Sequence, residues 1–134
     1  MQAIRVDFTS TNDDPIPAGA YNAVVAGVEE KVAGENAKNP GSKMLLWTFE
    51  VQEPPEFSGR KLWVNTSLLP QALFTLRNLL RAVDPDNASD YDSELEFEPE
   101  DFVGRGLTLE VIQKKHYQDD TRMVNEVKKF LPLD

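Results

Sequence analysis

Three side chains suited to holding a nucleic-acid strand alternate along one short stretch of this chain. Lys61, Trp63 and Asn65 occupy every second position, with Leu62 and Val64 between them. A period of two is typical of a strand whose faces differ in character. A cation beside a flat ring suits phosphate contact and base stacking, the two interactions that hold single strands without sequence preference. The alternative is that Trp63 packs beneath a neighbouring helix and Val64 faces outward.

Further cations and aromatic rings extend this hypothesis. Lys114, Lys115 and Tyr117 lie with His116 in an expected loop, residues 113–120, where they could close over a bound strand, although Asp119 and Asp120 next to them equally suit a solvated hairpin tip. Trp47 alternates with apolar residues, which favours the core over stacking. The full set of candidate DNA-binding residues is Lys38, Lys43, Trp47, Arg60, Lys61, Trp63, Asn65, Lys114, Lys115, Tyr117 and Arg122.

The formal net charge of -9 is distributed unevenly. Of the 23 acidic residues, nine lie between Asp84 and Asp101, a stretch that holds no Lys or Arg. That leaves 14 acids against all 14 Lys and Arg in the rest of the chain, which is therefore formally neutral. Residues 31–81 are mildly basic, with seven Lys and Arg against four Glu. The overall acidity therefore does not exclude a polyanionic ligand.

Composition disfavours catalysis and membrane insertion. The chain has no Cys and a single His, so neither a thiolate nucleophile nor a His-based metal site is expected. There is no phosphate-binding Gly-rich loop and no GxSxG elbow. No stretch approaches the roughly 18 apolar residues of a membrane span. We expect a non-enzymatic, cytoplasmic protein of one domain, residues 1–134, with no cofactor and no membrane partner.

The remaining patterns predict five strands and one helix. Strands are expected over Ala20–Val32, with a bend or bulge at Gly27, and over Met44–Val51, Arg60–Thr66, Arg105–Ile112 and Thr121–Phe130. Ala33–Ser42 and Gln113–Asp120 are expected loops, and Glu53–Gly59 is an expected turn because of its two prolines. In the second strand Leu45, Trp47, Phe49 and Val51 are the predicted core residues, and in the fourth strand Leu107, Leu109 and Val111 are expected to face one way.

A helix is predicted from Leu69, with Pro70 in its first turn and Ser67 as the capping side chain. Its expected core stripe is Leu69, Leu73, Leu76, Leu80 and Val83. Phe74, with Arg77 and Arg81, lies away from this stripe, and an exposed Phe74 could contact a partner protein or another subunit. The favoured interpretation is that Phe74 lies at the edge of a broad core stripe.

The stretch Asp84–Asp101 is predicted to be a long exposed connection, partly disordered, because it contains Pro85 and Pro99 and little apolar periodicity. Such a run is usually a solvated linker. A functional alternative is that it recruits partners or competes with DNA, as acidic tails of bacterial single-strand binders do.

Three strands, a helix and two strands, with long loops after the first and fourth strands, is an order that resembles the OB-fold. This fold is a five-stranded barrel whose strands two and three, together with those two loops, bind oligonucleotides or oligosaccharides. We therefore predict a mainly β, OB-fold-like barrel with one helix between strands three and four.

The chain also resembles a family of small bacteriophage and prophage proteins, catalogued as a domain of unknown function and associated with phage recombination genes. The resemblance rests on five blocks: PAGAYNAVV (Pro17–Val25), KMLLWTFEV (Lys43–Val51), GRKLWVNTSLLPQALFTLRNLL (Gly59–Leu80), DFVGRGLTLEV (Asp101–Val111) and RMVNEVKKFLP (Arg122–Pro132). Members are regarded as OB-fold single-stranded DNA-binding proteins, so the resemblance implies that role. The acidic stretch is longer and more charged than this family pattern.

The leading hypothesis is a non-catalytic single-stranded DNA-binding protein that serves phage DNA replication or recombination. The main alternative is an interaction module of a phage recombination complex that contacts phage or host proteins through the helix and the acidic segment without binding DNA. A weaker alternative is an oligosaccharide-binding OB domain. Pairing between subunits through exposed sheet edges is left open.

Overall fold

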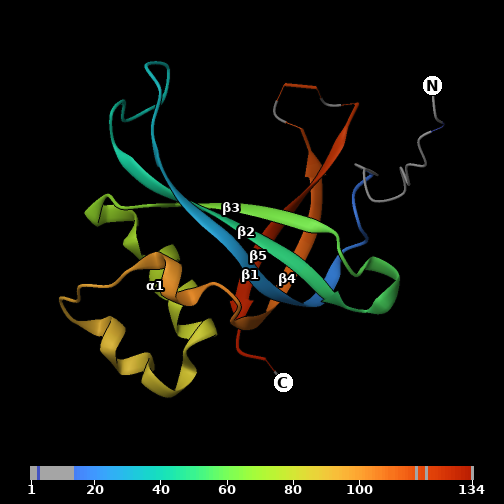
Figure 1. Cartoon of the computed structure of the whole chain (residues 1–134). Helices are drawn as coiled ribbons and strands as arrows, with labels where there is room; N and C mark the ends of the chain where they lie inside the picture. Colours follow the sequence, from blue (N-terminus) through green and yellow to red (C-terminus); the bar gives the residue numbers. More distant parts are fainter. Residues whose placement is uncertain (1–2, 4–13, 117, 120, 134) are drawn as a thin grey trace.

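One antiparallel sheet of five strands forms the framework of the protein (Figure 1). The computed structural model describes residues 3, 14–116, 118–119 and 121–133. The strands are β1 (Gly19–Val32), β2 (Lys43–Glu53), β3 (Lys61–Ser67), β4 (Gly106–Lys115) and β5 (Met123–Leu131), in the spatial order β3-β2-β1-β4-β5. The predicted mainly β architecture is confirmed.

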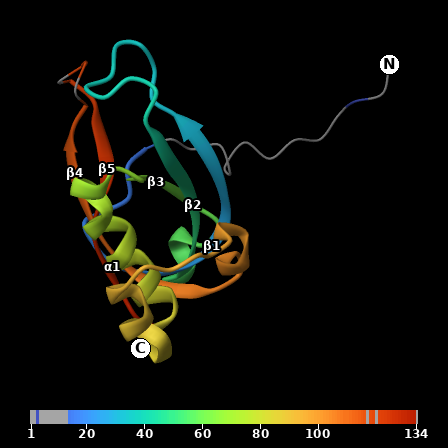
Figure 2. The same cartoon turned by 90° about the vertical axis from the view of Figure 1, so that its left-hand side faces the viewer.

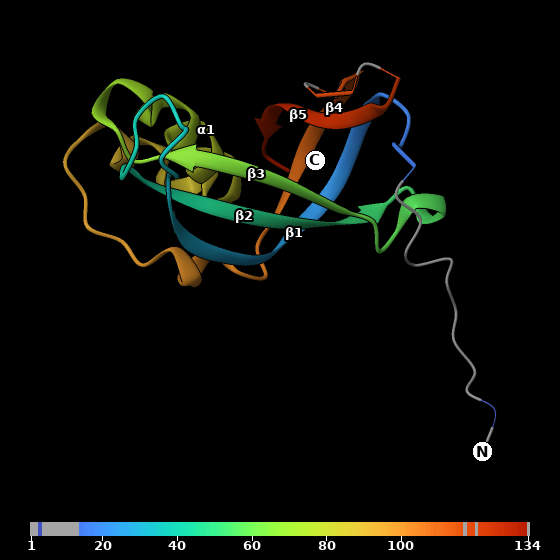
Figure 3. The same ribbon diagram turned by 90° about the horizontal axis from the view of Figure 1, so that it is seen from above.

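The sheet curls without closing. Within the described residues no strand ladder joins β3 to β5, so both are edge strands and the sheet is not closed into a barrel. β1 shifts register between Val25 and Gly27, which confirms the bulge expected there. In Figure 1 β4 and β5 run across the direction of β2 and β3, and seen from above β1 bends (Figure 3). This bend brings the two edge strands toward each other.

The core fills the concave side of the curled sheet. The residues expected to share a face in β2 and in β4 all lie inside, each at most 5% exposed, and in β4 the intervening Thr108 is buried as well. β3 contributes Leu62 and the hydroxyl-bearing Thr66, and the segment before β1 contributes Ile16. The aromatic ring of Phe49 packs against that of Phe130, whose centroid lies 6.1 Å away, and so links β2 to β5 across the core.

The only α-helix in the described part of the chain, α1 (Leu73–Val83), packs against this core and lies between β3 and β4 in sequence. Its buried residues are Leu76, Leu79, Leu80, Ala82 and Val83. The predicted stripe is wrong at Leu73, which is 41% exposed. The reason is that Pro70–Ala72 forms a separate 3₁₀ turn, whose three residues per turn break the expected phase. Ser67 does act as expected, since its Oγ accepts the Leu69 N–H at 3.1 Å.

The acidic segment, Asp84–Asp101, is exposed but attached to the body of the protein. It contains 3₁₀ turns at Pro85–Asp92 and Pro99–Phe102. The Tyr91 hydroxyl donates to the Asp84 carboxylate at 2.7 Å, and the carboxylate of Asp92 pairs with Arg81 of α1. Phe102 is buried, and the ring of Phe97 meets it edge-on. In Figure 1 the segment folds beneath α1, at the end of the molecule away from the β1–β2 and β4–β5 loops.

The hydrogen bond between Tyr91 and Asp84 predicts how stability changes with pH. It is the main cause that holds the pKa of Asp84 below its usual 3.8, while burial, aided by this bond, raises the pKa of Tyr91 to about 12. A lowered carboxyl pKa stabilises the fold above the unfolded-state pKa and is lost as the pH falls through the folded value. A raised phenol pKa stabilises the fold below the unfolded-state pKa and is lost as the pH rises toward the folded value.

Tyr91→Phe is therefore expected to lower the free energy of unfolding at neutral pH and to flatten its dependence on pH below about 4 and above about 10. Urea unfolding across the pH range measures this. Tyr21→Phe is the matched control for the acidic range, because the Tyr21 hydroxyl donates to the backbone carbonyl of Pro17 and not to a carboxylate. If the free energy of unfolding of Tyr91→Phe depended on pH below about 4 as that of the wild type does, the role assigned to the bond between Tyr91 and Asp84 would be contradicted.

Candidate functional site

The outer face of β3 carries the side chains singled out by their alternation. Lys61, Trp63 and Asn65 are all exposed, whereas Leu62 is buried and Val64 is half-buried against the core. The indole of Trp63 is 61% exposed, the largest ring exposure in the described residues. Trp63 therefore points outward, and the alternative in which it packs beneath the helix is excluded.

The outer face of the sheet beside Trp63 carries little side-chain bulk. Trp63 pairs with Thr48 of β2, and Thr48 pairs with Gly27 of β1, so these three positions form one row on the outer face. A Cβ added at Gly27 would meet no atom within 4 Å. A small side chain followed by no side chain leaves open space next to the indole. A flat group could lie on this row against Trp63.

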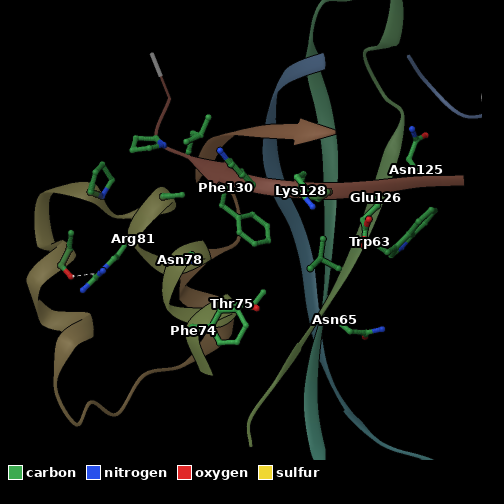
Figure 4. Close-up of a pocket in the computed structure, with 18 of the residues that line it drawn as sticks. Trp63, Asn65, Phe74, Thr75, Asn78, Arg81, Asn125, Glu126, Lys128 and Phe130 are labelled. Carbon is green, nitrogen blue, oxygen red and sulfur yellow. Dashed lines mark hydrogen bonds between the residues drawn. The ribbon is translucent and has the colours of Figure 1, made fainter. Parts of the chain in front are cut away.

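A groove of about 990 Å³ opens on the other side of Trp63, between β3, α1 and β5 (Figure 4). Phe74 of α1, which is 59% exposed, and Phe130 of β5 add two rings to its wall. Trp63 thus stands where the outer face of the sheet meets the groove. The groove occupies the open seam between the two edge strands.

The cations of the groove differ in availability. Lys114 pairs with Glu126 at 3.2 Å, and Arg81 pairs with Asp92, so both are largely neutralised locally. Lys128 and Lys129 are exposed and form no ion pair with any described residue. These two lysines were not among the predicted site residues. Only the structure reveals their place, on the strand that lies across the seam from β3.

The two long loops project from the same end of the molecule (Figures 1 and 2). Lys38 lies in the β1–β2 loop, and Lys43 at its edge pairs with Glu30 at 3.5 Å. Lys115 and Arg122 flank the β4–β5 loop, and both are exposed. None of these four residues lines the groove. They form a second group of cations beyond it.

The β4–β5 loop is closed by its own hydrogen bonds. The His116 N–H donates to the Arg122 carbonyl at 2.9 Å. The Thr121 hydroxyl and N–H both donate to the Asp119 carboxylate, which lowers the pKa of that carboxyl. Tyr117, a predicted stacking residue, lies outside the described residues. The bond between His116 and Arg122 holds the two ends of the loop together, so that Lys115 lies near Arg122.

Two of the predicted site residues have structural roles. The indole of Trp47 is fully buried, and its Nε1–H donates to the Thr66 hydroxyl at 2.8 Å. Trp47 is therefore a core residue, and its inclusion among stacking residues was wrong, because no face of its ring is open. The guanidinium of Arg60 donates to the backbone carbonyl of Asp14 and so ties the segment before β1 to the start of β3.

The family model described as protein of unknown function (DUF669) matches residues 7–134. The chain belongs to this family. No curated protein matches the chain. The family description assigns no activity, so the chemistry of the groove and of the outer face must indicate the function.

The arrangement supplies rings, cations and amides on an open surface. In the described residues no three His, Asp or Glu side chains are grouped so as to hold a metal ion. No described helix is long and apolar enough to cross a membrane. What the site can do chemically is bind an extended ligand that combines flat apolar groups with negative charges.

Proposed function

We propose that this DUF669 protein binds single-stranded DNA without sequence preference, in the service of phage DNA replication or recombination. The observation that carries the proposal is Trp63, an exposed indole between Lys61 and Asn65 on the outer face of β3. Each base stacked on an aromatic side chain contributes about 1–3 kcal/mol. Lys61 on the outer face, together with Lys128 and Lys129 at the groove, would supply the phosphate contacts.

The arrangement of strands supports an OB-like mode of binding. Three strands, α1 and two strands follow one another along the chain, the order on which the likeness to that partly open barrel rests. In OB domains the β2–β3 face and the β1–β2 and β4–β5 loops contact the oligonucleotide. Here that face carries Trp63, and those loops carry or border Lys38, Lys43, Lys115 and Arg122. A strand of DNA would run across the row of Gly27, Thr48 and Trp63.

A single strand suits this surface better than a duplex. Stacking on Trp63 needs a base with one face free, which a duplex does not offer along its length. The cations that pair with no described residue are spread between the outer face, the groove and the two loops, and are not gathered into one strongly basic patch. Outside the acidic segment the chain is formally neutral, so binding depends on stacking as well as on charge.

Fluorescence titration with oligo-dT and with duplex DNA over a salt series tests the proposal. Because Trp47 is fully buried, quenching by oligo-dT reports on Trp63. We expect quenching by oligo-dT, little by duplex, and an affinity that falls with salt by about 0.7 log unit per log unit for each phosphate neutralised. Absence of binding to a strand of about 30 nucleotides at low salt would overturn the proposal, because that length exceeds the site of one OB domain.

One observation favours a second candidate, the interaction module. Leu73 and Phe74 are 41% and 59% exposed on α1, beside Arg77 and a smaller cavity of about 390 Å³. An exposed aromatic and an aliphatic side chain next to a cation suit a protein partner better than solvent. This candidate replaces the first if oligo-dT leaves the fluorescence unchanged.

A further inference from the structure

Most carboxylates of the acidic segment have no partner within the described part of the protein. Asp84 and Asp92 pair with Arg105 and Arg81. The remaining seven are exposed and form no ion pair with any described residue: Asp86, Asp90, Glu94, Glu96, Glu98, Glu100 and Asp101. The segment therefore presents a dense negative charge that the body of its own chain does not neutralise.

An apolar side chain lies within this charge. Leu95 is 46% exposed, and Glu94 and Glu96 flank it. A chain that alternates carboxylates with an exposed apolar group resembles a nucleic-acid strand in its chemistry. The surface around Trp63 offers the complement, an open ring with Lys61 on the outer face and with Lys128 and Lys129 at the groove.

The structure keeps Leu95 away from the Trp63 of its own chain. Asp92 is held by Arg81, and Phe97 is held against the buried Phe102, so only four residues are free between two fixed points. Five extended peptide steps span at most about 17 Å, so an arc fixed at both ends can project only about half of that. Figure 4 places Arg81 and Trp63 at opposite ends of the groove.

We propose that the acidic arc Ser93–Glu96 of one molecule docks against Trp63, Lys128 and Lys129 of a second copy. Leu95 would cover the indole, and the glutamates beside it would pair with the two lysines. The contact joins two different surfaces, so it is head-to-tail and can propagate from one copy to the next.

The distribution of charge favours this contact despite the net charge of -9. All of the excess negative charge lies in the acidic segment, and the rest of the chain balances 14 acids against 14 bases. Two bodies therefore repel each other little, while the segment of one and the lysines of the other attract. Beyond the Debye length of about 8 Å at physiological salt, repulsion between the two segments is largely screened.

The contact would regulate the site assigned above, and in this respect it rests on the proposed function. The arc and a DNA strand compete for Trp63, so single-stranded DNA would dissociate the self-associated form into monomers. The self-association itself requires no DNA, and the two proposals can therefore fail separately.

Sedimentation velocity of the full chain without DNA tests the inference. We expect a mass above the 15.1 kDa of one chain at about 0.1 M salt and the monomer at about 1 M, where the Debye length shortens from about 10 to about 3 Å. Glu94→Gln/Leu95→Ser/Glu96→Gln should be monomeric at both salt concentrations and should bind oligo-dT as well as the wild type or better. Glu35→Gln/Glu56→Gln removes the same charge from exposed positions elsewhere and should still associate.

A mixing experiment distinguishes the head-to-tail contact from a symmetric one. Lys128→Glu/Lys129→Glu should be monomeric alone, as should the arc variant, with thermal melts confirming that both fold. Mixed together, they retain one intact surface each, so we expect a complex of two chains that grows no further. Any of three results would overturn the inference. The mixture fails to associate, the wild type is monomeric at about 0.1 M salt, or the wild type remains associated at about 1 M salt.

Discussion

Replacing Trp63 by alanine is expected to weaken binding to oligo-dT by about 5- to 150-fold, equivalent to the roughly 1–3 kcal/mol of one stacked base. The melting temperature should hardly change, because the indole is 61% exposed and contributes little to the core. Fluorescence anisotropy of a labelled oligo-dT measures the affinity, since the variant lacks the reporter indole. Circular dichroism measures the melting temperature.

Two further variants make this result specific to stacking. Trp63→Phe keeps a flat ring and should recover much of the affinity. Phe74→Ala removes another exposed ring, on α1 rather than on the sheet, and should leave the affinity for oligo-dT nearly intact if the strand follows the β2–β3 face. A melting temperature lowered by several degrees in Trp63→Ala, with unchanged affinity, would place Trp63 in a structural role.

The sequence left the direction of Trp63 open, because a period of two fixes only that Trp63 and Leu62 lie on opposite faces of the strand. Once Leu62 is placed in the core, the period of two in a strand leaves Trp63 no other side. The core residues of β2 and β4 follow from the same rule. The bulge at Gly27 was predictable because a glycine inside a strand pattern weakens the regular ladder there.

The groove could not be predicted because it depends on how distant strands approach. The β4–β5 pairing shifts between Glu110 and Val111, with Glu110 opposite Lys129 and Val111 opposite Val127. Lys128 is therefore the extra residue of a bulge, which breaks the alternation and leaves two successive lysines exposed. A strict period of two gives these lysines opposite faces, and so they carried no signal in the sequence.

The acidic segment shows a different limit. Its charge and prolines correctly indicated exposure, yet its attachment depends on single pairs such as Tyr91 with Asp84 and Arg81 with Asp92. Such pairs have no periodicity, so composition alone predicted a looser connection than the structure shows. The error at Leu73 is related, because sequence spacing could not separate a 3₁₀ turn from the first turn of α1.

Replacing Trp47 by alanine should have the opposite signature to Trp63→Ala. The Trp47 side chain is fully buried, so its removal leaves a cavity and is expected to lower the free energy of unfolding by about 3–5 kcal/mol. That is a large share of the roughly 5–15 kcal/mol by which small domains are stable. Urea unfolding followed by circular dichroism measures the loss.

The hydrogen bond from Trp47 to Thr66 can be separated from the packing by a double-mutant cycle. Trp47→Phe leaves the buried Thr66 hydroxyl with only a 3.5 Å contact to the Leu45 carbonyl, so part of the cost is that of an unsatisfied polar group, about 1–3 kcal/mol. Adding Thr66→Val removes that group and should restore part of the stability. If Trp47→Phe instead weakened binding to oligo-dT without loss of stability, Trp47 would belong to the binding surface and the assignment of the core would be wrong.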